Sequence, residues 1–192
     1  MDDDRLSQVQ DTESLLAEIV RLRGEVATLQ ERVERLDELA HQDSLIELPN
    51  RRGFMRRLEE AIARVRRYDG SAAMLFVDLD GLKLINDSFG HKAGDEALRQ
   101  VSRLLVGGVR RNDCVARIGG DEFAILLEQA DESSAHDTAS RLADAISGCD
   151  FIHDGDALPL SVAIGVAMVG PDDDAAIVME RADEEMYKRK AA

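Results

Sequence analysis

The sequence is poor in the features that cross-link a chain or anchor it in a membrane. Its two cysteines, Cys114 and Cys149, stand far apart and not in C-x-x-C pairs. This spacing argues against a disulfide scaffold and a structural zinc site, and it favours reduced thiols in the cytoplasm. No apolar run approaches the roughly 20 residues that span a bilayer. The first residues, Met-Asp-Asp-Asp-Arg, lack the basic and apolar regions of a secretory signal. We therefore expect a cytoplasmic protein with no membrane partner.

Positive charge is also scarce. The chain has 24 Lys and Arg residues against 39 Asp and Glu, which gives a formal net charge of −15. Because nucleic-acid binders neutralise phosphates with clustered Lys and Arg, this balance argues against nucleic acid as a partner. Hydrophobic residues nevertheless make up 44% of the 192 residues, enough for one domain with a substantial core plus an appendage.

The first 42 residues contain no proline and carry a regular apolar repeat. Mostly β-branched residues occupy position a of a heptad and leucines occupy position d: Leu15, Ile19, Leu22, Val26, Leu29, Val33, Leu36 and Ala40. This choice of residues favours a parallel two-stranded coiled coil. The alternative is a single amphipathic helix packed on its own domain, whose apolar stripe is normally wider. We expect residues 1–42 to form a dimeric coiled coil, with no room for a sensor domain in that segment.

Residues 43–192 have the pattern of one α/β domain. Helices are predicted over 51–68, 94–106, 133–146 and 174–190, and strands over 72–77, 114–118 and 122–127. The segment that follows Asp80 is expected to be a polar turn region. Gly119 and Gly120 predict a tight hairpin turn, because glycine tolerates positive φ. The pattern favours a mixed or antiparallel sheet covered by helices.

The helix predicted over 51–68 has an arginine-rich face. It carries Arg51, Arg52, Arg56, Arg57, Arg64, Arg66 and Arg67. Two interpretations are open, a solvated helix surface and an anion-binding site, and the solvated surface is favoured.

Carboxylates gather at the predicted strand ends. Asp78 and Asp80 are two residues apart, so their side chains lean to one face, and Asp121 and Glu122 sit at the hairpin turn. Mg²⁺ takes oxygen ligands and usually acts on substrate phosphates. Each pair alone also fits a solvated strand end or a simple turn. Together they strengthen the interpretation as a metal–nucleotide site, with solvated strand ends and a simple turn as the alternative.

The hairpin motif is Gly119-Gly120-Asp121-Glu122-Phe123. Further blocks surround it in a fixed order: Asp43 to Arg52, Phe76 to Asp80 with Lys83 and Asn86, Gly90 to Asp95, and Ala182 to Tyr187. In these motifs the chain resembles the GGDEF family of diguanylate cyclases. The resemblance implies a nucleotidyl-cyclase-like palm over residues 43–192, with a central, mainly antiparallel sheet flanked by helices. It also implies an enzyme that joins two GTP molecules into cyclic di-GMP and releases pyrophosphate.

The resemblance implies roles for individual residues. Mg²⁺ or Mn²⁺ would be held by Asp78, the Leu79 carbonyl, Asp121 and Glu122. Asp121, Glu122 and Lys83 would be catalytic, with Asp121 helping to deprotonate the attacking hydroxyl. The substrate-binding residues would be Asn86 and Asp95 at the guanine, Lys83 and Lys190 at the phosphates, and Gly81, Leu82 and His91 around them.

An R-x-x-D motif, Arg110 to Asp113, precedes the signature. In the family this is an inhibitory product site, and Arg141 would be a secondary contact. The chain departs from the family pattern at Ile46, Glu47 and Leu82 and in lacking the usual Gly-Arg-Asn tail. These departures bear on the catalytic rate more than on identity. The alternative function is a catalytically silent receptor that binds cyclic di-GMP or GTP.

Overall fold

The computed structural model describes residues 18–19, 21–30, 32, 40–68 and 70–190. Contacts divide the chain into two units, Met1–Ala40 and His41–Ala192. Residues 18–19, 21–30 and 32 of the first unit are helical and exposed. The predicted seam positions among them, Ile19, Leu22, Val26 and Leu29, are 45 to 57% exposed in the single chain. Leu15, Val33 and Leu36 lie outside the described residues, and the pairing of two helices stays a prediction.

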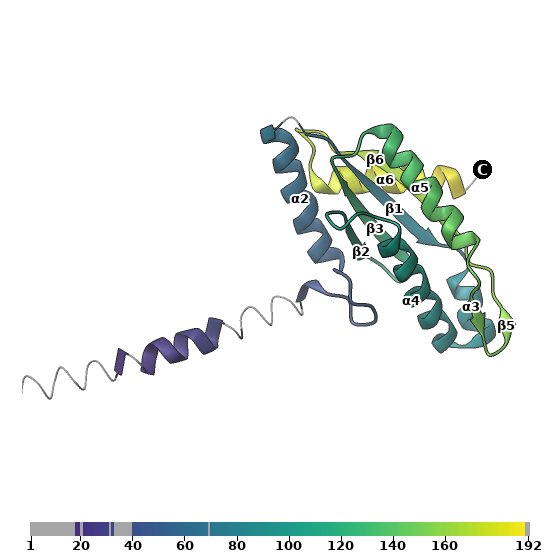
Figure 1. Ribbon diagram of the computed structural model, residues 1–192, viewed down its shortest axis with the longest axis horizontal. Coiled ribbons are helices and arrows are strands. Elements are labelled where there is room, and N and C mark those ends of the chain that lie inside the picture. The colour runs from purple at the N-terminus through teal and green to yellow at the C-terminus, as the bar shows by residue number, and fades with distance from the viewer. Residues whose placement is uncertain (1–17, 20, 31, 33–39, 69, 191–192) are drawn as a thin grey trace, which may run out of the picture. The chain divides into compact units, whose positions relative to one another are not determined.

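A four-stranded antiparallel sheet forms the centre of the second unit (Figure 1). The strand order is β2 (Cys114–Arg117), β3 (Glu122–Glu128), β1 (Ala72–Leu79) and β6 (Val162–Met168). Each strand is antiparallel to its neighbours. The central strands β1 and β3 are almost wholly apolar because both faces of the sheet are covered. The predicted strands and the mainly antiparallel sheet are confirmed.

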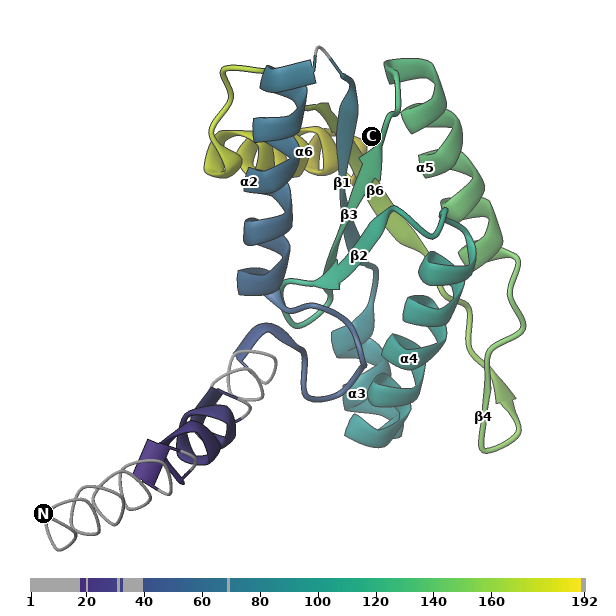
Figure 2. The same cartoon turned by 60° about the vertical axis from the view of Figure 1, so that its left-hand side comes forward.

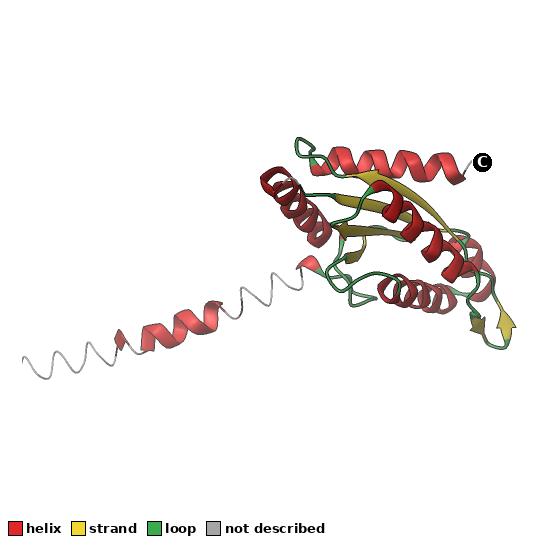
Figure 3. Cartoon of the chain, turned by 45° about the horizontal axis from the view of Figure 1, so that its top comes forward, coloured by secondary structure: helices red, strands yellow, loops and turns green. Residues whose placement is uncertain are grey.

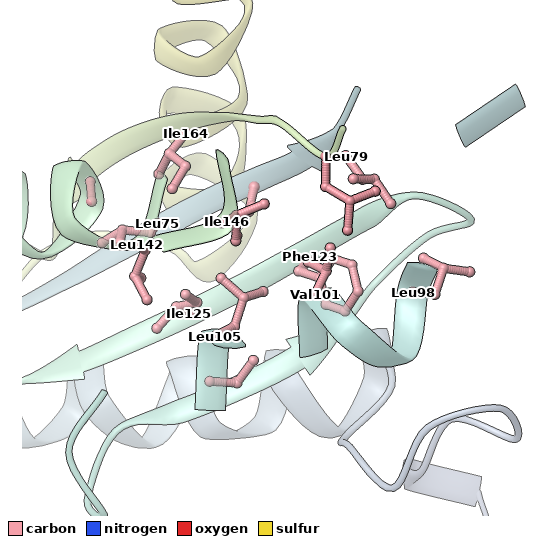
Figure 4. Close-up of a cluster of buried hydrophobic side chains, with 14 of the residues drawn as sticks. Leu75, Leu79, Leu98, Val101, Leu105, Phe123, Ile125, Leu142, Ile146 and Ile164 are labelled. Carbon is pink, nitrogen blue, oxygen red and sulfur yellow. The ribbon is translucent and has the colours of Figure 1, made fainter. Parts of the chain in front are cut away.

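Helices cover both faces of this sheet (Figure 3). One face carries α3 (Leu82–Phe89), α4 (His91–Gly107) and α5 (Glu132–Ser147), and the other carries α2 (Arg51–Tyr68) and α6 (Ala175–Lys190). Side chains of β1 alternate between two cores, as strand geometry requires. Leu75 packs towards α4 and α5 (Figure 4), and Val77 belongs to the same core. Met74 and Phe76 pack towards α2 and α6.

The segment after β1 differs from the prediction. Instead of a polar turn region it forms α3, and α4 begins at His91 rather than at residue 94. Only two residues of α3, Leu82 and Ile85, are buried, too few for a clear helical repeat. Gly94 lies inside α4, where an added Cβ would collide with the Asn86 side chain. The glycine therefore allows α3 and α4 to approach closely.

A small hairpin of β4 (Ile152–His153) and β5 (Asp156–Ala157) extends beside α4 (Figure 2). Its turn residues Asp154 and Gly155 have φ of 51° and 94°. His153 is buried, and its Nδ1 lies 2.8 Å from Oε2 of Glu96 on α4. This contact fixes the hairpin against the helix that carries Asp95.

Candidate active site

Asp78 and Asp80 meet the last residue of α6 at the end of β1. Lys190 Nζ donates a hydrogen bond to Asp78 and lies 3.6 Å from Asp80 Oδ1. Ser161 Oγ also donates to Asp80 Oδ2, at 2.8 Å. The hydrogen bond to Asp78 is the main cause that raises the pKa of Lys190. The two aspartates therefore share a face, as predicted, and an ammonium group lies between them.

The signature hairpin brings further carboxylates to the same place. The strand register puts Glu122 opposite Asp78, and the Asp121 carbonyl accepts a hydrogen bond from Leu79 N at 2.9 Å. Burial raises the pKa of Glu122, and the charges of Asp121, Asp78 and Asp183 raise it further. The end of the sheet thus concentrates negative charge that favours a cation.

This set of oxygen donors fits a divalent ion of the Mg²⁺ type. Lys190 already shows that a cation is attracted to the Asp78 carboxylate. Among the residues that the structure describes, no three His, Cys, Asp or Glu side chains are grouped closely enough to hold a metal by themselves. Mg²⁺ usually keeps several waters and uses one or two carboxylates together with substrate phosphates. The arrangement fits an ion that arrives with a nucleotide.

The predicted hairpin is present, but its expected backbone conformation is wrong. The positive-φ glycines of the described chain are Gly81, Gly90 and Gly155, so neither glycine of the Gly-Gly pair is among them. A Cβ on Gly119 would instead collide with Oε2 of Glu122. The first glycine of the signature therefore makes room for the Glu122 carboxylate.

A cavity of about 320 Å³ opens beside Glu122, between α2 and α6. Arg51 and Asp183 line it together with Phe76 and Met179. The Arg51 charge lowers the pKa of Glu122 and partly offsets the nearby carboxylates. Sequence reasoning assigned no role to Arg51 or Asp183, although both lie in the quoted family blocks.

The predicted guanine-binding residues lie on the packed pair α3 and α4. Asn86 lies against Gly94, the residue before the partly buried Asp95. Gly90 N donates to Asn86 O at 2.9 Å, and Gly90 joins the two helices with a positive φ of 84°. Lys83 and His91 are exposed on the same pair of helices. Asn86 and Asp95 are therefore held close to each other by the helix packing.

The loop between β1 and α3 contains the predicted phosphate-lining residues. Gly81 precedes α3 with φ of 70°, a left-handed conformation that favours glycine. Leu82 begins the helix and is buried, at 8% exposure. Leu82 thus fills a buried position, as the Phe that is common in the family would.

Arg110, Asp113 and Arg141, the predicted inhibitory set, line one cavity of about 310 Å³. Both Asp113 carboxylate oxygens accept backbone hydrogen bonds, from Arg110 N at 2.8 Å and from Glu128 N at 3.0 Å. Asp113 thus fixes the turn, while the Arg110 side chain stays exposed.

The arginine-rich face of α2 borders a neighbouring cavity of about 1010 Å³. Arg57 and Arg64 line it together with Arg110 and Arg111. Arg64 also forms an ion pair with Glu128. All seven arginines of this face are nevertheless exposed, as the solvated-surface interpretation predicts.

Arg117 is a site residue that sequence reasoning missed. Its guanidinium group donates to the Gly120 carbonyl and to the Asp43 carboxylate. The only sequence signal was an arginine two residues before the Gly-Gly pair.

Comparison with known protein families identifies a match over most of the chain. The family model described as diguanylate cyclase, GGDEF domain, matches residues 40–192. TpbB of Pseudomonas aeruginosa is 38% identical over 191 residues, which cover 97% of this chain and 43% of TpbB. DgcP of the same species is 32% identical over 180 residues, which cover 94% of this chain and 27% of DgcP. The chain thus spans less than half the length of these two diguanylate cyclases.

Solved structures with the same fold extend this match. A structure of the coiled coil and GGDEF domain of DgcB from Caulobacter crescentus, in complex with c-di-GMP, has a TM-score of 0.83 at 28% identity and covers 93% of this chain and 95% of that one. Diguanylate cyclase SiaD from Pseudomonas aeruginosa, in complex with its activator SiaC, has a TM-score of 0.76 at 26% identity and covers 98% of this chain and 74% of that one. Within the described part of the chain, no helix is long and apolar enough to cross a membrane.

Proposed function

Because this chain belongs to the GGDEF family, we propose that it is a diguanylate cyclase that condenses two GTP molecules into cyclic di-GMP and releases pyrophosphate. The observation that carries the proposal is that Asp78, Asp121 and Glu122 lie at one end of the sheet, where Lys190 forms an ion pair with Asp78. Such a cluster of acceptors and one ammonium group is suited to bind a nucleotide triphosphate together with a divalent cation.

Asp78, Asp121, Glu122 and the Leu79 carbonyl would hold Mg²⁺ or Mn²⁺. The bound ion would neutralise charge on the phosphates and so relieve the conflict between an anionic substrate and a chain of net charge −15. Lys83 and Lys190 would bind phosphate oxygens, and the backbone at Gly81 and Leu82 would line them. For Lys190 this requires exchanging its present contact with Asp78 for one with the substrate.

Asn86 and Asp95 would read the guanine edge, with His91 nearby at the start of α4. A carboxylate accepts hydrogen bonds from the N1 and N2 positions of guanine, which adenine cannot supply in that pattern. The close packing at Gly94 supports this role, because it fixes Asn86 beside the turn of α4 that carries Asp95.

In each half-reaction the 3′-hydroxyl oxygen of one GTP forms a bond to the α-phosphorus of the facing GTP. The bond from that phosphorus to the pyrophosphate group breaks, and pyrophosphate leaves. Asp121 accepts the hydroxyl proton as the oxygen attacks. Two such steps close the ring. Because both reactants are nucleotides that must be held in the right geometry, their positioning supplies much of the rate acceleration.

Each domain would hold one GTP, so turnover needs two domains facing each other. The segment 1–42 would supply this as a parallel coiled coil preceding the catalytic domain at 43–192, and it would keep the two domains at high effective concentration. The exposed seam residues Ile19, Leu22, Val26 and Leu29 support the pairing. So does the likeness over 93% of the chain to a DgcB structure that contains a coiled coil and a GGDEF domain.

Cyclic di-GMP would inhibit the enzyme by binding at Arg110, Asp113 and Arg141. Arginine makes forked contacts with phosphate and guanine acceptors. Their common cavity of about 310 Å³ supports this assignment, and the DgcB structure in complex with c-di-GMP supports binding of the product by a similar protein.

The proposal is tested by incubating the protein with GTP and Mg²⁺ and measuring cyclic di-GMP by liquid chromatography. We expect product from the wild type and none after chelation of the metal. Absence of product from a confirmed dimer would overturn the proposal. If calorimetry then showed cyclic di-GMP or GTP binding without turnover, the silent-receptor alternative would replace it.

The role of the coil is tested separately with Leu22→Asp combined with Leu29→Asp. Sedimentation should show a monomer, turnover should fall, and binding of GTP to each domain should persist. A monomer with wild-type turnover would contradict the requirement for the coil.

A further inference from the structure

Arg117, the last residue of β2, joins two segments that are distant in sequence. Its Nη2 donates to the Gly120 carbonyl at 2.7 Å, and Nε points to the same oxygen at 3.3 Å. Its Nη1 lies 3.2 and 3.3 Å from the two carboxylate oxygens of Asp43, 74 residues earlier in the chain. The two side chains are only 14% and 18% exposed. This ion pair is therefore better shielded than a typical surface pair.

Asp43 organises the loop through which the chain enters the domain. Its Oδ1 accepts hydrogen bonds from Leu45 N and Ile46 N, and its own N–H donates to the Leu48 carbonyl at 2.9 Å. A further bond, from Arg117 N to the Pro49 carbonyl at 2.9 Å, fastens the loop to β2. The 43–50 loop is thus a compact unit built around one carboxylate, and Arg117 contacts it twice.

The other end of Arg117 holds the peptide group that leads into Asp121. The Gly120 carbonyl belongs to the Gly120–Asp121 peptide, so its direction sets where the Asp121 backbone begins. Ile118 N and Gly119 N both donate to the Glu122 carbonyl and close the turn. The Asp121 carbonyl is in turn bonded to Leu79 N at the end of β1. A continuous set of hydrogen bonds therefore runs from the 43–50 loop to the predicted metal ligands.

We propose that Arg117 is a positioning residue that couples the 43–50 loop to metal binding and turnover at Asp121, by holding the Gly120–Asp121 peptide in one orientation. The guanidinium group is planar and rigid, so a shift of Asp43 is passed to the Gly120 carbonyl instead of being absorbed by side-chain rotation. The inference rests on the proposed function, since it concerns the same site. It adds a route by which the entering segment regulates that site.

Two substitutions separate charge from geometry. Asp43→Asn keeps an oxygen that accepts from Leu45 N and Ile46 N but removes the charge that holds Arg117. Arg117→Lys keeps the charge but loses the fork that reaches the Gly120 carbonyl. Both should lower kcat about ten- to a hundredfold with little change in KM for GTP, because misplacement of a reacting group costs rate more than binding. Both should also weaken Mn²⁺ binding in the presence of a non-hydrolysable GTP analogue, measured by calorimetry.

Arg181→Gln is the matched control. Arg181 donates at 2.7 Å both to the Met168 carbonyl and to Asp173, whose Oδ2 also accepts from Gly170 N. Like Arg117, Arg181 therefore bonds to one carbonyl and one carboxylate. Its contacts lie near Met168, which pairs with Ala73 at one end of β1, whereas Asp78 and the candidate site lie towards the other end. The control should lower the melting temperature as the Arg117 variant does, without changing the affinity for Mn²⁺.

The double variant Asp43→Asn with Arg117→Lys should lose little more than either single variant, because both break one linkage. Additive losses would overturn the proposal, and so would an Arg117→Lys variant whose Mn²⁺ affinity and kcat match the control. If the wild type made no cyclic di-GMP while the Arg117 variant still weakened Mn²⁺ binding, the proposed function would fail and the positioning role would stand.

Discussion

Lys190 donates a hydrogen bond to Asp78 from a position 112 residues later in the chain. The contact places the ammonium group where a divalent cation and a triphosphate are expected to bind. We therefore expect Lys190 to compete with a metal ion for Asp78 when no nucleotide is present and to contact the phosphates when one is bound.

The first prediction concerns this double role. Lys190→Gln should raise the affinity of the GTP-free protein for Mn²⁺ by about two- to fivefold, because an exposed ion pair contributes up to about 1 kcal/mol. The same substitution should raise KM for GTP. Calorimetry with Mn²⁺ alone and steady-state kinetics measure the two effects, and Lys188→Gln, on the same exposed turn of α6 but paired with Glu185, is the control. Stronger binding of both Mn²⁺ and GTP, or weaker binding of both, would contradict the competition.

The second prediction concerns the partly buried carboxylate of the signature, Glu122. Glu122→Gln should reduce turnover by at least about a hundredfold, as loss of a group that stabilises the transition state does. Asp121→Asn should do the same, whereas Asp156→Asn, an exposed carboxylate on β5, should not. Retained turnover in either signature variant would overturn the site assignment.

The third prediction is that Glu122→Gln also stabilises the metal-free protein. Burial and neighbouring carboxylates raise the pKa of Glu122 above its usual 4.5. A raised folded-state pKa means that ionisation costs stability, so the cost is absent below the unfolded pKa and grows as the pH rises through it. The melting temperature of the variant in a chelating buffer should exceed that of the wild type at neutral pH, and the difference should vanish below pH about 4.5. A difference in melting temperature that grows as the pH falls would contradict this prediction.

The fourth prediction separates Arg110 from Asp113. Arg110→Ala should raise the half-inhibitory concentration of cyclic di-GMP about tenfold. The melting temperature should change little, because the Arg110 side chain is exposed. Asp113→Ala should also relieve inhibition but should lower the free energy of unfolding by about 1–3 kcal/mol, since two backbone N–H groups lose their acceptor. Inhibition assays and urea unfolding measure the two effects. Equal stability losses for both variants would contradict the division of roles.

The fifth prediction concerns the reading of guanine. Asp95→Asn should lower kcat/KM for GTP about a hundredfold or more, because a site built for hydrogen bonds discriminates strongly when one is lost. The ratio of kcat/KM between GTP and inosine triphosphate, which lacks the 2-amino group, should fall towards one. An unchanged ratio would contradict the assignment of Asp95 to guanine recognition.

Local sequence patterns were sufficient for three of the four strands of the sheet and for the identity of the signature, whereas β6 (Val162–Met168) was not predicted. The strands at Ala72–Leu79 and Glu122–Glu128 are apolar runs that end in acidic residues, and an apolar strand of that length has few alternatives to a buried position. The helix over Arg51–Tyr68 has an apolar residue on one face at each turn. These features depend on residues close together in the chain, so periodicity reveals them.

The tertiary structure alone decided which side chains meet. α3 was missed because its two buried residues are too few for a repeat, and the Gly-Gly turn was misjudged because Gly119 is needed for space beside Glu122 and not for a positive φ. The contacts of Lys190 with Asp78 and of Arg117 with Asp43 span 112 and 74 residues. Such contacts depend on strand register and on the packing of helices across the sheet, which no local pattern encodes. The sequence by itself therefore determined the family and the acidic motif, whereas the fold decided how that motif is held and what it is connected to.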